Sequence, residues 1–155
     1  MKRISLSIGV IGSACILFGA DPAGFRVWKS SELQDYSTSL HAKMNKDKIG
    51  SEMFGKMGSS TPQISHREAD GLAELHQQVD DWFVVESGVA MLQVGGDMVD
   101  KKVTAPNEVR GASINGGVKK QLGAGDIVYI PANQPHRLFV EPGKQFTYFV
   151  IKVPK

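Results

Sequence analysis

The stretch that most constrains the fold is residues 125–138, GDIVYIPANQPHRL. Residues 127–130 are β-branched or aromatic and follow a Gly-Asp turn signal, which is typical of a strand. The corner after them holds two prolines within five residues, and this excludes a helix. His136 stands where the chain becomes apolar again. A strand there would hold its imidazole, the commonest side-chain metal ligand, on rigid backbone.

A second informative stretch lies upstream, at residues 74–88, ELHQQVDDWFVVESG. If it begins as a strand, the two-residue period places three polar side chains on one face: Glu74, His76 and Gln78. A turn at residues 79–80 would lead into a second strand, on which Asp81 and Phe83 share a face. Donors on neighbouring strands, joined by a distant histidine, are the ingredients of a mixed histidine and carboxylate metal site.

Together the two stretches resemble the two motifs of the cupin superfamily. The second motif has a glycine, a proline and a histidine at fixed spacing, and Gly125, Pro131 and His136 fall in register with them. Asn133 stands in place of the inner glycine of this motif, and Val140 in place of its final asparagine. The resemblance covers residues 65–153.

The first cupin motif has two histidines separated by one residue, then a glutamate and a glycine. Counting back from Gly88 places Asp81 at the glutamate position, His76 at the second histidine position and Glu74 at the first. A second register makes His76 the first histidine and Gln78 the second, with a shortened gap to Asp81.

The resemblance implies an all-β fold for residues 62–155, a double-stranded β-helix or jelly-roll barrel whose two motifs lie on adjacent strands around a cavity. It also implies one divalent metal ion (Fe, Mn, Ni or Zn) with the ligands Glu74, His76, Asp81 and His136, and Gln78 as the alternative ligand. The activities that it implies are those of dioxygenases, isomerases and lyases.

Three further residues are candidates for the cavity wall. A short strand at residues 64–67 would point His66 either into the cavity, as a ligand contact, or into water. Phe83 shares its strand face with Asp81. The apolar run at residues 145–153 predicts a last strand, and if Tyr148 faces inward its hydroxyl would need a partner.

The segment between the two motifs contains several turn signals. Gly-Gly-Asp at residues 95–97 predicts a tight hairpin between its flanking strands. Residues 101–117 are polar and rich in Gly, Asn and Pro, which predicts a long surface loop. Arg110 in this loop is either a solvated charge or a substrate clamp. A strand at residues 118–122 then returns to the sheet.

Before the barrel, residues 21–61 are predicted to contain one helix and a linker. An apolar stripe at spacings of three and four predicts the helix over residues 30–48: Leu33, Tyr36, Leu40 and Met44. We expect this helix to pack on the outside of the barrel or onto a partner. Residues 50–60, rich in Gly, Ser and Met, are interpreted as a linker.

Residues 1–20 have the pattern of a secretory signal peptide. Lys2 and Arg3 precede a largely apolar run, and Gly19-Ala20 precede Asp21. This predicts a periplasmic or secreted protein that has no membrane anchor once the signal is removed. The only cysteine, Cys15, lies in this segment, so the mature chain would have no disulfide and no thiol nucleophile.

The charge balance argues against nucleic-acid binding. The whole chain has 18 basic and 16 acidic residues, but two of the basic residues lie in the predicted signal. The mature chain is therefore close to neutral, without the clustered basic surface that nucleic-acid binding needs.

Two functions remain open from the sequence. One is a metal-dependent small-molecule enzyme, and the other is a small-molecule or sugar-binding cupin without metal. In the second, His76 and His136 would be polar cavity residues. Several strands are apolar on both faces, which a lone small barrel would expose, so a homodimer is also predicted.

Overall fold

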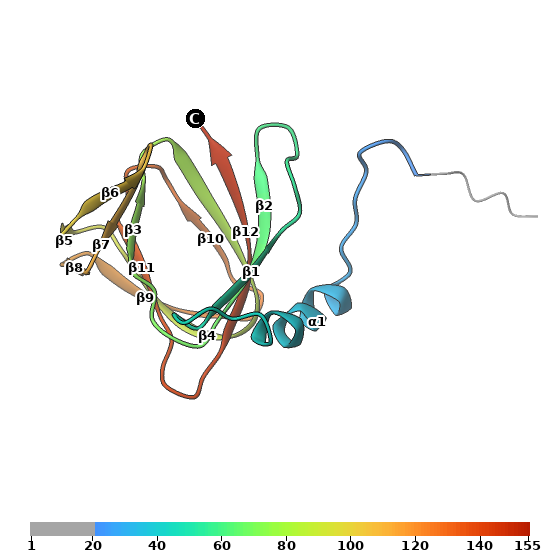
Figure 1. Cartoon of the computed structure of the whole chain (residues 1–155), viewed down its shortest axis with the longest axis horizontal. Helices are drawn as coiled ribbons and strands as arrows, with labels where there is room; N and C mark the ends of the chain where they lie inside the picture. The colour runs from blue at the N-terminus through green and yellow to red at the C-terminus, as the bar shows by residue number, and fades with distance from the viewer. Residues whose placement is uncertain (1–20) are drawn as a thin grey trace, which may run out of the picture.

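The structure is a computed structural model that describes residues 21–155. The predicted signal peptide, residues 1–20, lies outside the described residues. Figure 1 shows strands curled around a common interior, with one helix on the outside. The described elements, in chain order, are α1 (Ser30–His41), β1 (Ile49–Met53), β2 (Thr61–Arg67), β3 (Ala73–His76), β4 (Val79–Val94), β5 (Asp97–Val99), β6 (Lys102–Ala105), β7 (Glu108–Gly111), β8 (Ser113–Asn115), β9 (Val118–Gly123), β10 (Ile127–Ile130), β11 (His136–Phe139) and β12 (Phe146–Pro154).

The barrel is organised around β4, a strand of 16 residues. Its first half pairs with β12 on one edge and with β10 on the other. Its second half pairs with β9 on one edge and with β11 on the other. β11 also pairs with β3, and β3 with β7. Because β4 belongs to both halves, the two halves enclose one interior. The predicted all-β double-stranded β-helix is confirmed.

Gly88 marks the point where β4 passes from one half of the barrel to the other. Its φ is +80°, and a Cβ atom there would collide with the backbone carbonyl of Gln145. An L-residue therefore meets both backbone strain and a steric clash at this position. The glycine of the first motif is required by the bend of this strand.

The inner face of β4 changes from polar to apolar along the strand. Asp81 is buried at its start, and Phe83 and Val85 follow on the same face. These two side chains belong to an apolar core that fills the barrel: Phe83, Val85, Ala90, Leu92, Leu122, Ile130, Leu138, Val140, Phe146, Tyr148 and Val150. The inner face of β4 is therefore polar only near Asp81, at the end where the strand begins.

The helix packs on the outside of the barrel, as predicted, with Leu40 fully buried. The helix ends at His41 and not at residue 48, so Met44, the last residue of the predicted stripe, lies beyond it. The predicted linker is partly wrong, because Ile49–Met53 forms β1 and pairs with β2. Within residues 21–155, no helix combines the length and the apolar character needed to cross a membrane.

The predicted surface loop at residues 101–117 is wrong, because it contains β6, β7 and β8. β6 and β7 form a hairpin that turns at Asn107, where φ is +63°. All four residues of β6 are exposed, as on many edge strands, and the polar residues and turn signals around this hairpin resemble those of a loop.

Two turn predictions also need correction. Residues 95–97 do turn the chain, but β5 pairs with β8 and not with β4, so the predicted hairpin is wrong. Residues 79–80 are not a turn, because β4 already begins at Val79 and pairs there with Pro154. Pairing with the C-terminal strand extends β4 beyond what the local sequence indicates.

We expect Gly88→Ala to lower the free energy of unfolding by about 3 kcal/mol, because it adds left-handed strain and a backbone clash. Urea denaturation measures this. Gly123→Ala is the matched control, since nothing lies within 4 Å of a Cβ atom there and its φ is not positive. An equal loss in both variants would contradict this role of Gly88.

Candidate metal centre

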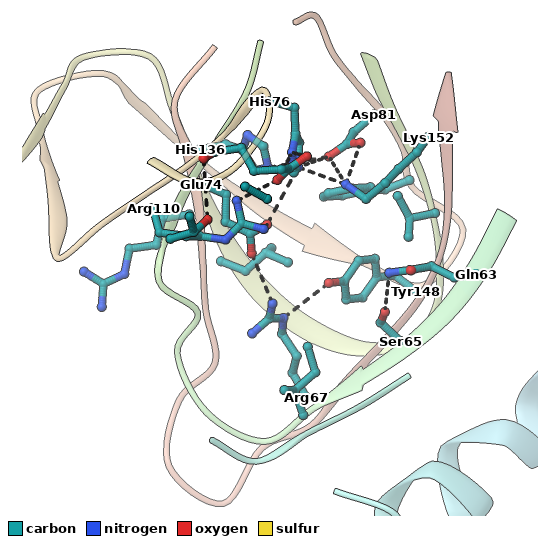
Figure 2. Close-up of a pocket in the computed structure, with 18 residues that line it drawn as sticks. Gln63, Ser65, Arg67, Glu74, His76, Asp81, Arg110, His136, Tyr148 and Lys152 are labelled. Atoms are coloured by element: carbon teal, nitrogen blue, oxygen red, sulfur yellow. Dashed lines mark hydrogen bonds and ion pairs between the residues drawn. The ribbon is translucent and has the colours of Figure 1, made fainter. Parts of the chain in front are cut away.

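A cavity of about 460 Å³ opens at the polar end of the barrel. Figure 2 shows two groups of polar side chains in it, one around His76 and the other around Arg67. The first group comes from five strands, β3, β4, β7, β11 and β12. Residues of the two predicted motifs therefore meet in one place.

Strand pairing sets the positions of this group. His136 on β11 is the direct partner of Glu74 on β3, which in turn pairs with Arg110 on β7. Two residues along β3, His76 pairs with Glu108. Asp81 pairs with Lys152 of β12. The site is thus built from cross-strand neighbours, whose backbones are fixed by ladder hydrogen bonds.

The corner of the second motif is attached to the strand of the first. Asn133 has a φ of +65°, a left-handed conformation that asparagine tolerates better than most residues. Its backbone N–H donates to the carbonyl of His76 at 2.8 Å, and its side-chain amide donates to Gln77. Asn133 therefore takes the conformation for which the motif uses glycine, and it holds the two motifs together.

Both imidazoles are oriented through their Nδ1 atoms. His136 Nδ1 donates to the carbonyl oxygen of Gln134 at 3.1 Å, and His76 Nδ1 donates to the Glu108 carboxylate at 2.7 Å. A carbonyl and a carboxylate only accept hydrogen bonds, so the proton resides on Nδ1 in each neutral ring. Both Nε2 lone pairs are then directed into the cavity. The rings are nearly buried and their centroids are 5.5 Å apart.

Two carboxylates lie beside the Nε2 atoms. Glu74, His76 and His136 each offer a ligand atom, and these atoms all lie within 4.8 Å of one another. Asp81 Oδ2 lies 3.3 Å from His76 Nε2 and 3.6 Å from His136 Nε2. The structure thus brings together the four predicted ligands Glu74, His76, Asp81 and His136.

Lys152 places a cation in the same group. Its Nζ lies 2.9 Å from His76 Nε2 and donates to Asp81 Oδ1 at 3.1 Å. The ammonium therefore interacts with two of the candidate ligand atoms. A metal ion bound to His76 Nε2 would require the flexible Lys152 side chain to move away from that nitrogen. Lys152 would keep its ion pair with Asp81 Oδ1.

The pKa values of the two histidines are shifted in opposite directions. Burial alone would lower the pKa of His76, but Asp81 can accept a hydrogen bond from the protonated ring, and the charges of Asp81 and Glu108 favour that form, so the pKa is raised overall. Burial lowers the pKa of His136, and Glu74 offsets this only in part. Burial would raise the pKa of Glu74, but the charges of Arg110 and Arg67 outweigh it and the pKa is lowered. That of Asp81 is lowered by His76 and Lys152 against its burial. Both carboxylates are therefore ionised at neutral pH.

The donor set fits a divalent transition metal. Imidazole nitrogens and carboxylate oxygens suit Fe, Mn, Ni and Zn, and two histidines with a carboxylate leave positions open for a substrate. The hydrogen bonds from Nδ1 to Glu108 and to a carbonyl are those that metal-bound histidines usually make.

The other predicted site residues have different positions. Phe83 and Tyr148 line the cavity, and Arg67 donates to the Tyr148 hydroxyl at 3.2 Å. Gln78 is exposed and lies outside the cavity lining, so the structure does not place it near the histidines.

Both interpretations of His66 are wrong. It is fully buried, but on the face of β2 that packs against the helix, where its ring nitrogens contact Thr147 and Glu68. Glu68 also binds His41, so these three side chains connect α1 to the barrel. Successive side chains of β2 point to opposite faces of the sheet, and Ser65 and Arg67 lie on the face that lines the cavity. His66, between them, lies on the other face.

Sequence reasoning missed several cavity residues. Lys152 carries a usable signal, because the two-residue period places it on the same strand face as Tyr148. Glu108 belongs to the segment that was interpreted as a loop, as does Arg110, whose interpretation as a substrate clamp stays a prediction. Arg67 carries no motif, and its position depends on the face that β2 presents.

Comparisons with known proteins identify the fold. No family model matches the chain. No curated protein matches it either. Among solved structures, a double-stranded beta-helix protein from Klebsiella pneumoniae aligns with a TM-score of 0.56 and 16% identity, over 84% of this chain and 90% of that one. TT1209 from Thermus thermophilus aligns with a TM-score of 0.53 and 14% identity, over 76% and 93%. This chain has a cupin-type fold.

The solved structures with a similar fold include an enzyme. DMSP lyase DddQ from Ruegeria pomeroyi aligns with a TM-score of 0.50 and 16% identity. The alignment covers 68% of this chain and 47% of DddQ, so the cupin-type chain spans about half the length of that relative. Likeness at this identity establishes the fold and no reaction.

In metal-free protein we expect His76 to titrate above the ordinary histidine pKa and His136 below it. Asp81→Asn removes a charge and changes a hydrogen bond at His76, so the pKa of His76 should fall while that of His136 stays low. NMR titration of the imidazole nitrogens measures both. An unchanged pKa for His76 in the variant would contradict this role of Asp81.

The stability of the protein should also depend on pH through His136. Because the pKa of His136 is lowered in the folded protein, unfolding takes up a proton there, and this contribution makes the free energy of unfolding decrease as pH falls through about 6.5.

Proposed function

We propose that this protein is a metal-dependent enzyme that acts on a small molecule in the barrel cavity. The observation that supports this most is the convergence of two Nε2 atoms, each on an imidazole whose Nδ1 proton is held by an acceptor. Glu74 and Asp81 supply the carboxylates for one divalent ion, Fe, Mn, Ni or Zn.

A divalent ion at this position would polarise a carbonyl or enolate oxygen of a substrate, or activate water or O₂. The residues of the chain supply the surrounding chemistry. Glu108 and the Gln134 carbonyl keep the rings in one tautomer. The Lys152 ammonium, beside Asp81 in the cavity, would donate a hydrogen bond or a proton to a bound molecule. Phe83, Leu138 and Val150 belong to both the apolar core and the cavity lining, and they exclude water from that part of the wall.

We propose dioxygenase, isomerase or lyase chemistry, the three reaction classes that the cupin resemblance implies. The fold likeness to a DMSP lyase supports a lyase as one candidate and identifies no substrate for this chain.

We expect protein purified without chelating resin to contain about one equivalent of a transition metal. His136→Ala should reduce bound metal at least tenfold, and Glu108→Ala should weaken metal affinity roughly 10–100-fold by releasing the His76 ring. Elemental analysis and competition with a chelator measure these changes.

His41→Ala is the matched control for these variants. It removes a histidine from the only other group, among the described residues, whose ligand atoms lie close enough for a metal: His41, His66 and Glu68. Bound metal that is lost in His41→Ala and kept in His136→Ala would contradict the barrel site.

A non-catalytic ligand-binding protein without metal is the second candidate, and Lys152 favours it. An ammonium 2.9 Å from His76 Nε2 takes up a lone pair that a metal would use. Lys152→Met distinguishes the two functions. In the enzyme, this variant should bind metal at least as tightly as the wild type and lose turnover. In a metal-free binding protein, neither form would take up Fe, Mn, Ni or Zn.

A homodimer forms part of the proposal. Trp82 and Tyr129 are cross-strand neighbours on the outer face of β4 and β10, and they are 43% and 47% exposed. Ile127 on the same face is 68% exposed. An apolar surface of this kind is typical of an interface. Sedimentation should give a dimer at tens of micromolar, as an order of magnitude, and a monomer for Trp82→Glu. A monomeric wild type would contradict this part.

The proposed place of action is the periplasm or the exterior of the cell, and the signal-like residues 1–20 support it. Fusing these residues to a reporter that is active only after export tests this. A reporter that stays inactive would contradict the proposal.

A further inference from the structure

The cavity contains a buried guanidinium with unused hydrogen-bond donors. Arg67 extends from β2, and its side chain is only 10% exposed. Its Nε donates to Tyr148, and its Nη2 reaches Glu74 Oε1 only at 3.5 Å. Glu74 is shared with Arg110, whose Nη2 lies 3.4 Å away. Within residues 21–155, no acceptor is hydrogen-bonded to Arg67 Nη1.

Tyr148 provides a second unused donor beside the first. Its hydroxyl oxygen accepts the hydrogen of Arg67 Nε, so its own proton must point elsewhere. None of the described residues accepts that proton in a hydrogen bond. The ring is held between Phe83 and Phe146, with centroid distances of 5.0 Å and 5.1 Å. The hydroxyl therefore has a fixed position on the cavity wall.

The charges around the cavity favour an anion once a metal is bound. The guanidinium of Arg137 is compensated outside the cavity, since it donates to the carbonyls of Gly71 and Ala112 and lies 3.9 Å from Asp70. The other six charged side chains of the lining are the cations Arg67, Arg110 and Lys152 and the carboxylates Glu74, Asp81 and Glu108. With both imidazoles neutral these six charges cancel, and a divalent ion would raise the net charge to +2. Uncompensated charge is costly in such an enclosed site, and a negatively charged ligand would offset it.

Figure 2 shows Arg67 at the opposite end of the cavity from His76, with Tyr148 between Arg67 and Lys152. Gln63 and Ser65, hydrogen-bonded at 3.2 Å, extend the polar wall on the side of Arg67. The volume of about 460 Å³ corresponds to roughly 15 water-sized groups. A small molecule can therefore span both ends.

We propose that the ligand of this cavity is a small carboxylate, whose oxygens accept hydrogen bonds from the Arg67 guanidinium and the Tyr148 hydroxyl. The planar fork of a guanidinium matches the two oxygens of a carboxylate. The rest of the molecule extends toward His76 and His136. This inference rests on the proposed function for the position of the reacting end, but the anion site needs no metal.

Calorimetric titration of the metal-free protein tests the anion site alone. The probes are succinate, its uncharged diamide succinamide and inorganic phosphate. Succinate should bind at least tenfold more tightly than the other two. Equal binding of succinamide would overturn the proposal, as would binding of phosphate as tight as that of succinate.

Two variants and one control assign the binding to this end of the cavity. Arg67→Gln and Tyr148→Phe should each weaken succinate binding at least tenfold, and both keep the shape of the wall. Lys119→Gln removes a positive charge from the exterior, where Lys119 lies over Phe139, and should leave the affinity within twofold of the wild type. Wild-type affinity in both cavity variants would overturn the proposal.

A repeat with metal-loaded protein separates this inference from the proposed function. If the wild type takes up no metal but succinate binding depends on Arg67, the anion site stands and the metal proposal fails. If metal is bound while succinate binds equally to the wild type and Arg67→Gln, the metal proposal stands and the carboxylate site is overturned.

Discussion

The architecture depends on the double pairing of β4. This single strand pairs with β12 and β10 before Gly88 and with β9 and β11 after it. The bend at Gly88 is possible because glycine tolerates its φ and the close carbonyl of Gln145. Since β11 continues the sheet to β3, the same pairing places His136 beside Glu74. The site is therefore a consequence of how the barrel closes.

The cavity balances opposite charges that are expensive to bury. Asp81 is compensated by Lys152, and Glu74 lies between Arg67 and Arg110. Burial raises the pKa of a carboxylate and lowers that of an imidazole, so the direction of each shift shows which neighbours outweigh burial. They do so at both carboxylates, but not at His136. A neutral His136 beside ionised carboxylates is the state in which a histidine serves as a metal ligand.

Much of the fold and part of the site could be predicted from the sequence. The spacing around His136 identified the barrel, and counting back from Gly88 placed Asp81 and His76 on one site, because motif spacing reflects strand geometry. Lys152 and Arg67 were missed, since a cation on a strand has no motif and its face depends on register. Glu108 was missed because β7 belongs to an edge hairpin with the composition of a loop. Asn133, a departure from the motif, preserves the conformation that the motif's glycine supplies.

We propose that two imidazoles with fixed Nδ1 protons bind one metal ion through Nε2. X-ray absorption spectroscopy of the cobalt-loaded protein tests this, because imidazole rings give a multiple-scattering signature that can be counted. We expect two imidazoles, with oxygen ligands completing the coordination. His136→Ala should leave one imidazole or abolish binding. A spectrum without imidazole scattering, or one that is unchanged in His136→Ala, would overturn the metal site.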